Sequence, residues 1–234
     1  MQLSKRLSAI ASMVEERECL ADVGTDHGYI PIFLVEQGKI ARAIAMDINE
    51  GPLKRAREHI LEHGLEDRIC TRQSNGVAQL REGEAQSVVI AGMGGLLTMQ
   101  ILSEGREVLK SVKELILQPQ SEIGLVRRFL QEQEYQIVDE NMVEEDGKYY
   151  PMMRVLHGKM DAWTDTEYLY GRYLLLKKDP TLLAFLEREE QTYDGVMERL
   201  RENESLKTQR RREEIHAKLL LIGEAKKAYV REQG

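Results

Sequence analysis

One short segment near the start of the chain constrains the fold more than any other feature. Residues 21–28 read Ala-Asp-Val-Gly-Thr-Asp-His-Gly, which places acids and two glycines just where an apolar run ends. A second acid, Asp47, closes the apolar run 43–46. It follows about 20 residues later, the spacing at which a neighbouring parallel strand presents a carboxylate to a ribose. The segment therefore predicts a strand–turn–helix unit that binds an adenosine-containing cofactor.

The middle of the turn distinguishes between cofactors. A dinucleotide-binding turn has the pattern G-x-G-x-x-G, which lets a pyrophosphate approach bare amides, but here Asp26 lies in the turn and the last glycine is absent. The carboxylates of Asp22 and Asp26 would repel a pyrophosphate and favour a cationic group. S-adenosylmethionine (SAM) carries a sulfonium and an amino-acid tail, so we expect SAM as the cofactor. The alternative is a strand–turn–helix unit that binds nothing.

Strand and helix patterns alternate along the first two thirds of the chain. Apolar runs predict strands at 19–23, 40–47, 69–73, 87–91, 114–118 and 135–138. Helical spacing predicts helices at 3–14, 29–37, 52–64, 96–109 and 121–133, the last capped by Ser121. Asp146-Gly147 predicts a hairpin ahead of 150–156. These elements predict an α/β fold, a Rossmann-like doubly wound sheet with an antiparallel edge hairpin.

The character of the chain changes from Thr164 onward. Apolar residues recur every three or four positions between dense charges, with a break at 202–205. This pattern predicts a C-terminal helical extension with coiled-coil packing. We therefore expect two domains, a SAM-binding domain at 1–160 and a helical, coiled-coil domain at 161–234.

Composition narrows the class of protein. The chain has no apolar run of membrane-spanning length and no signal peptide, so we expect a cytoplasmic protein without membrane contact. Cys19 and Cys70 fit no metal spacing and are expected to be reduced thiols, so we predict no metal site. The net charge of −7 argues against a chain coated by nucleic acid but leaves room for a local basic face.

The cofactor candidates follow from the predicted sheet, because three loops (24–28, 47–49 and 91–95) should meet at the carboxyl ends of its central strands. Asp47 should bind both ribose hydroxyls, Ile48 should pack on the adenine, and Gly24 should allow close backbone approach. Met93 lies where target and methyl group would meet, or is core filler. The predicted cofactor-binding residues are Asp22, Gly24, Thr25, Gly28, Asp47, Ile48, Asn49, Asn75, Gly76, Gly92 and Met93.

Five segments carry a resemblance to a known family. They are Leu-Ser-Lys-Arg-Leu at 3–7, Asp-Val-Gly-Thr-Asp-His-Gly-Tyr-Ile-Pro at 22–31, Asp47 with Asn-Glu-Gly-Pro at 49–52, Ala-Gly-Met-Gly-Gly at 91–95, and Leu-Ile-Leu-Gln-Pro at 115–119. Together they resemble the bacterial TrmK family, over roughly residues 2–156. The resemblance implies a class I SAM-dependent methyltransferase that modifies N1 of adenine 22 in tRNA, followed by a C-terminal coiled coil.

Methylation of N1 leaves positive charge on the adenine ring, which a carboxylate near the ring would stabilise. Asp26 is the first catalytic candidate, and its alternative role is to cap the following helix. His27, the second candidate, would orient Asp26 or pass a proton to solvent, or else serves packing.

A tRNA partner requires basic and aromatic side chains at the surface. Phosphate contact or base stacking is expected of Arg6, Tyr29, Lys148, Tyr149 and Tyr150, with ordinary surface or edge-strand roles as the alternative. Lys207, Arg210, Arg211 and Arg212 form the densest basic run, an RNA contact or only a solvated helix face.

Other functions and assembly states remain open at this point. The rival functions are methylation of a small molecule or protein, and a non-catalytic nucleotide-binding adaptor. The expected oligomeric state is a monomer or a weak dimer.

Overall fold

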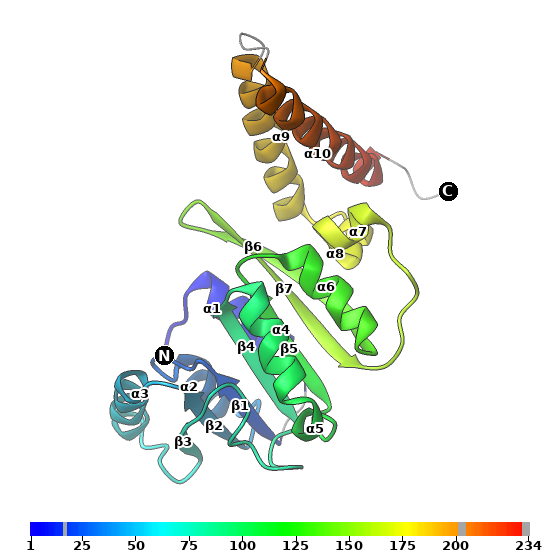
Figure 1. The fold of residues 1–234 in the computed structure, drawn as a ribbon. Helices are drawn as coiled ribbons and strands as arrows, with labels where there is room; N and C mark the ends of the chain where they lie inside the picture. Colours follow the sequence, from blue (N-terminus) through cyan, green and yellow to red (C-terminus); the bar gives the residue numbers. More distant parts are fainter. Residues whose placement is uncertain (16–17, 201–204, 231–234) are drawn as a thin grey trace. The chain divides into compact units, whose positions relative to one another are not determined.

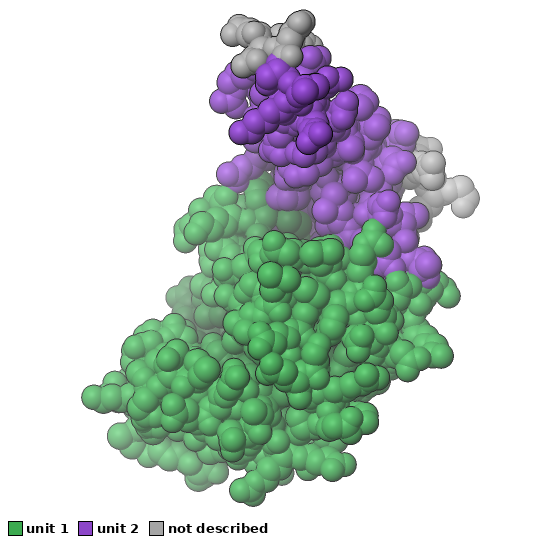
Figure 2. Space-filling view, in the orientation of Figure 1, with its two compact units in different colours: residues 1–161 green, residues 162–234 purple. Residues whose placement is uncertain are grey.

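The chain divides into two compact units. The computed structural model describes residues 1–15, 18–200 and 205–230. Residues 1–161 form the first unit and residues 162–234 the second, coloured green and purple in Figure 2. That each unit is a domain with its own role, as expected from the sequence, stays a prediction.

The first unit is built on a seven-stranded sheet with the order β3-β2-β1-β4-β5-β7-β6 (Figure 1). Its strands are β1 (Cys19–Val23), β2 (Arg42–Asp47), β3 (Ile69–Gln73), β4 (Ser87–Met93), β5 (Glu114–Pro119), β6 (Tyr135–Glu145) and β7 (Lys148–His157). The first five are parallel, whereas β7 is antiparallel to β5 and to β6. The predicted doubly wound sheet with an antiparallel edge hairpin is confirmed, and its switch point lies between β1 and β4.

Six helices cover the two faces of this sheet (Figure 1). On one face lie α1 (Lys5–Met13), α2 (Tyr29–Glu36) and α3 (Glu50–Glu62), and on the other α4 (Gly95–Glu104), α5 (Arg106–Leu109) and α6 (Ile123–Glu132). Ile10 of α1, Ile32 of α2 and Val89 of β4 belong to one buried cluster. Since successive strand residues point to opposite faces, the neighbouring Val88 and Ile90 point toward the layer of α4, α5 and α6.

Two predictions about helices in the first unit are wrong. The expected helix 96–109 is divided at Gly105 into α4 and α5. An added Cβ at Gly105 would lie 2.1 Å from Cγ2 of Val77, so the segment between β3 and β4 packs against a residue without a side chain. Ser121 does not cap α6, because its Oγ accepts from the Gly95 amide at 3.2 Å. The N-cap of α6 is Glu122, at φ +47° and without a side-chain capping bond.

The second unit is helical, as predicted. It contains α7 (Asp165–Tyr170), α8 (Arg172–Leu176), α9 (Pro180–Leu200) and α10 (Leu206–Val230). The last two run side by side, and the Lys226 ammonium lies 2.6 Å from Glu190 (Figure 1). Ile215 and Ile222 are buried one heptad apart, but coiled-coil packing as such stays a prediction.

Two further points concern the helices. Residues 202–204 of the predicted break between the last two helices lie outside the described residues. None of the helices in the described ranges combines the length and the apolar character that crossing a membrane requires.

Candidate active site

The turn after β1 is shaped by bare backbone. Gly24 and Gly28 have φ angles of +77° and +72°, a region that favours glycine. The amides of Gly24 and Thr25 both donate to the Met46 carbonyl, at 2.8 and 3.0 Å, which ties the turn to the end of β2. An added Cβ at Gly24 would lie 2.4 Å from Cε of Met93 at the end of β4. Close approach of three strand ends therefore requires glycine here.

A buried carboxyl group lies beneath this turn. Asp22 is 4% exposed, and its Oδ2 accepts from the Thr25 hydroxyl at 2.6 Å. Burial raises the pKa of Asp22 to about 6, against the opposing effect of the Thr25 hydrogen bond, and the charge of Asp47 raises it further. A carboxylate held in this way gains from a cationic ligand, which would stabilise its ionised form.

The ends of β2 and β3 supply a second carboxylate and an apolar surface. Oδ1 of Asp47 accepts from the Asn49 amide at 2.8 Å, which fixes the side chain at the strand end. Ile48 beside it is 55% exposed, although it is a large aliphatic residue. Gln73 donates to the Ile48 carbonyl at 3.0 Å and so joins the β3 end to this loop, and Asn75 is exposed just beyond. An acid and an open apolar face therefore lie side by side.

Asp26 points away from the role of helix cap. The N-cap of α2 is Gly28 and no side chain caps the helix, so the capping alternative for Asp26 is wrong. Its carboxylate is 61% exposed, with Oδ1 2.6 Å from Nη2 of Arg55 and Oδ2 3.6 Å from Nε2 of His27. Asp26 adopts φ +48°, a left-handed conformation that aspartate and asparagine tolerate. The carboxylate is thus held by α3 and accessible to a ligand.

Three rings stack beside Asp26. The His27 ring lies 5.0 Å from that of Tyr29 and 5.3 Å from that of His59, with the planes 7° and 20° apart. His59 also places Nδ1 3.0 Å from the His27 carbonyl oxygen. Nδ1 of His27 is buried and has no hydrogen-bond partner among the described residues. The stack gives Tyr29 a packing partner, and its predicted RNA contact stays a prediction.

A glutamine connects the first helix to the loop after β4. Gln118 is fully buried, and its Oε1 accepts from Nη1 of Arg6 at 3.0 Å and from the Gly92 amide at 3.2 Å. The Arg6 guanidinium also lies 5.4 Å from the centroid of the Tyr150 ring. Arg6 and Gly92, chosen separately from the sequence, are therefore joined by a residue that was given no role, and Arg6 in turn contacts Tyr150.

Comparison with known proteins identifies the family. A family model described as a methyltransferase domain matches residues 3–153. The tRNA (adenine(22)-N(1))-methyltransferase of Bacillus subtilis is 34% identical over 205 residues, 86% of each chain. The structure of the B. subtilis m1A22 tRNA methyltransferase TrmK is 31% identical with a TM-score of 0.85, covering 96% of this chain and 98% of that one. This chain belongs to the TrmK family.

A similar protein from another organism has been solved with a ligand. Sp1610 of Streptococcus pneumoniae, in complex with S-adenosyl-L-methionine, is 35% identical with a TM-score of 0.86. The match covers 96% of this chain and 99% of that one. TrmK-type architecture thus extends over both units, and the fold class expected from the sequence is confirmed.

The remaining candidates lie in the loops at the switch point, on the β6–β7 hairpin and on α10. The three loops expected to meet do so at the switch point, while the binding roles of their residues stay predictions. Lys148 is exposed at the tip of the β6–β7 hairpin, and Tyr149 beside it is partly buried. The basic run of α10 is exposed, with Arg211 2.9 Å from Glu214. Within the described ranges, no cluster of three His, Cys, Asp or Glu side chains is arranged to hold a metal ion.

Three residues at this site were missed from the sequence. Arg55 and His59 lie on α3, and nothing in their own segment indicates that they face the turn after β1. Gln118 did carry a signal, because it is a polar residue at the end of the buried strand Leu-Ile-Leu. A buried amide at the carboxyl end of a central strand is expected to have partners in the adjoining loops.

The buried Asp22 leads to a prediction about pH. Its folded pKa of about 6 lies above the ordinary 3.8, so the free protein loses stability as pH rises through this interval and Asp22 ionises. A cationic ligand favours the ionised form, so we expect SAM affinity to fall as pH drops below about 6. Calorimetry in two buffers of different ionisation enthalpy should detect proton release on binding near pH 6. The same pH dependence in Asp22→Asn would contradict this assignment.

Proposed function

We infer that this protein is a SAM-dependent tRNA methyltransferase that acts on N1 of adenine, at position 22 in its relatives. The observation that carries the inference is the match to the B. subtilis tRNA (adenine(22)-N(1))-methyltransferase, which extends over 86% of both chains. A match of this extent includes the second unit, which a generic methyltransferase domain would not require. Methylation of a small molecule or of a protein has no comparable support.

The residues at the switch point fit SAM. Asp22 offers a buried carboxylate to a cation, Gly24 leaves backbone accessible, and Asp47 with the exposed Ile48 suits a ribose and an adenine face. The turn lacks the G-x-G-x-x-G pattern that binds a pyrophosphate. SAM supplies the methyl group from a sulfonium, so the protein itself needs no covalent nucleophile.

The chain's own residues then have to hold the adenine and stabilise its charge. Asp26 accepts from the adenine amine and offsets the positive charge that develops on the ring. His27, 3.6 Å from Asp26, orients that carboxylate. The Gly92 backbone, fixed by Gln118, forms the floor on which the base lies. Positioning and charge stabilisation together account for most of the acceleration that such a transfer needs.

The direct test uses labelled SAM and unmodified tRNA. The methyl group should be found on N1 of a single adenine when the RNA is digested and analysed by mass spectrometry. A second reaction with tRNA in which adenine 22 is replaced by guanine should give no label. Label on the protein, on a different base, or on no RNA at all would contradict the proposed function.

The exposed basic run of α10 leads to a prediction about RNA affinity. Reversing Arg210, Arg211 and Arg212 to Glu in the full-length protein should weaken tRNA binding about tenfold or more at physiological salt. The slope of log affinity against log salt should become shallower, because phosphate contacts are lost. Filter binding over a salt series measures both, and SAM affinity should not change.

A matched control reverses three exposed cations of the first unit, Arg42, Lys54 and Arg81, to Glu. This control changes the net charge by the same amount without touching α10. If it weakens tRNA binding as much as the α10 variant does, the effect is general repulsion and α10 is not an RNA-binding surface.

A further inference from the structure

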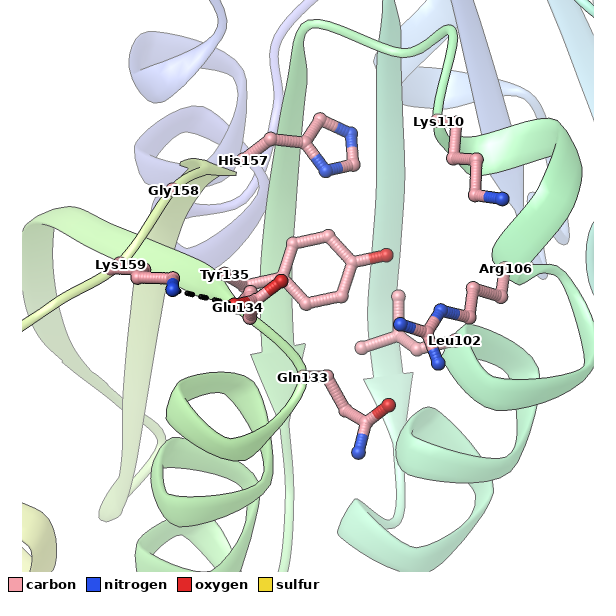
Figure 3. A pocket seen from close by; sticks show the side chains of 9 residues that line it. All are labelled: Leu102, Arg106, Lys110, Gln133, Glu134, Tyr135, His157, Gly158 and Lys159. Atoms are coloured by element: carbon pink, nitrogen blue, oxygen red, sulfur yellow. Dashed lines mark ion pairs between the residues drawn. The ribbon is translucent and has the colours of Figure 1, made fainter.

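A cavity lies at the end of the sheet opposite to the candidate active site. It measures ≈ 340 Å³, and Figure 3 shows the nine residues that line it. Tyr135 at the start of β6 pairs with His157 at the end of β7. Because β7 is antiparallel to β5, this edge is the amino end of the parallel strands. Nothing in the proposed methyl transfer uses this place.

The lining is rich in cations. Arg106, Lys110 and Lys159 line the cavity together with one acid, Glu134. Lys159 lies 3.1 Å from Glu134, and Lys110 lies 2.7 Å from Glu107, which is outside the lining. All four side chains of these pairs are more than half exposed, so each pair contributes little and an anionic ligand can replace its acid.

Two polar groups of the lining make no hydrogen bond or ion pair with another described residue. Within the described residues, the Arg106 guanidinium makes no hydrogen bond or ion pair, and neither does the Tyr135 hydroxyl. Tyr135 is nevertheless only 4% exposed, and Figure 3 shows its hydroxyl directed toward the space near Arg106 and Lys110. Burial raises the pKa of Tyr135, so the hydroxyl keeps its proton and remains a donor. The hydroxyl is not one of the buried atoms that lack a partner in the described residues, so it opens into the cavity, where a ligand oxygen can accept from it.

Two contacts fix the aromatic wall of the cavity. Nε2 of His157 lies 2.9 Å from the Leu109 carbonyl oxygen, which fixes the imidazole. The His157 ring in turn lies 5.1 Å from that of Tyr135. Leu102 adds an apolar side chain to the lining. The cavity therefore combines an aromatic and partly apolar wall with several donors that can face an anion.

We propose that this cavity is a phosphate-binding site. A guanidinium, two ammonium groups and a phenol line one space, and together they form a donor set that can recognise phosphate oxygens. The volume lies at the lower end of the range for ligand pockets, so a ligand no larger than a small nucleotide fits inside. The phosphate belongs either to such a free molecule or to the RNA backbone. Each source is tested by its own arm of the experiment.

The first arm of the test uses inorganic phosphate and ribose 5-phosphate with the full-length protein. Neither probe carries adenine, so the cofactor site does not compete for it. We expect saturable binding by calorimetry, weakened about tenfold in Arg106→Gln and a few-fold in Tyr135→Phe. Lys54→Gln, which removes an exposed charge on α3, should bind as the wild type does. Thermal melts should show that all three variants remain folded.

The second arm uses tRNA. If the small probes do not bind but Arg106→Gln weakens tRNA binding and lowers its salt slope by about 1, the phosphate belongs to the RNA backbone. The proposal is overturned if the wild type binds no probe and Arg106→Gln leaves tRNA binding unchanged. It is also overturned if Lys54→Gln reduces binding as much as Arg106→Gln does, because the effect would then be one of net charge.

Discussion

Arg127→Met should lower the free energy of unfolding by about 3–5 kcal/mol, the loss typical of a buried ion pair deprived of one partner. Arg127 of α6 and Glu140 of β6 are 1% and 0% exposed, and Nε of Arg127 lies 2.8 Å from Oε1 of Glu140. Methionine fills much of the space, but the buried Glu140 carboxylate then loses the Arg127 guanidinium. Chemical denaturation followed by circular dichroism measures the loss.

Two further variants decide whether the ion pair is the cause. Replacing both partners, with Arg127→Met and Glu140→Met, should recover a large part of the lost stability, since no unpaired charge remains. Lys54→Met should change stability by no more than about 0.5 kcal/mol, because its pair with Glu58 is exposed. A double variant as unstable as Arg127→Met alone would show that packing, and not charge pairing, makes this contact important.

Asp26→Asn should slow methyl transfer by about 100-fold while SAM affinity stays within a few-fold of the wild type. The carboxylate interacts most strongly when the adenine ring becomes cationic, so its loss raises the barrier more than it weakens binding. Asparagine also tolerates the φ of +48° at this position, and the turn should keep its shape. Single-turnover kinetics with saturating tRNA isolates the chemical step.

Arg55→Gln is the matched control, because it removes the cation 2.6 Å from Asp26 and leaves the carboxylate in place. We expect its single-turnover rate to stay within a few-fold of the wild type. If Arg55→Gln is as slow as Asp26→Asn, the ion pair matters for the shape of the turn, and Asp26 has no direct catalytic role. Wild-type rates in Asp26→Asn would lead to the same conclusion.

The sheet could be predicted because its signals are local. Buried parallel strands appear as short apolar runs, and Asp146-Gly147 with φ angles of +52° and +73° forms the tight turn that its sequence favours. The position of the site followed from topology, since loops after neighbouring parallel strands meet at one edge. Local patterns of this kind specify where a site lies.

Long-range partners could not be predicted from local patterns. Ser121 precedes a helix as a good cap would, but its hydroxyl oxygen accepts instead from the Gly95 amide. The Arg127–Glu140 pair and the Arg55–Asp26 contact each involve a helix residue whose segment shows only ordinary amphipathic spacing. Each contact depends on how a helix is rotated about its axis against its neighbours. The apolar spacing of a single sequence does not determine that rotation.

The hydrogen bond between Arg6 and Gln118 also determines when the site can form during synthesis. Arg6 lies in α1, yet its partners are Gln118, 112 positions later in the chain, and Tyr150 of β7. Until β5 and β7 exist, the guanidinium has nothing to bind and the Gly92 loop lacks the glutamine that fixes it. The contacts of Arg6 are therefore complete only after β7 has been made, and a nascent chain that stops before β7 holds no formed site with which to modify RNA.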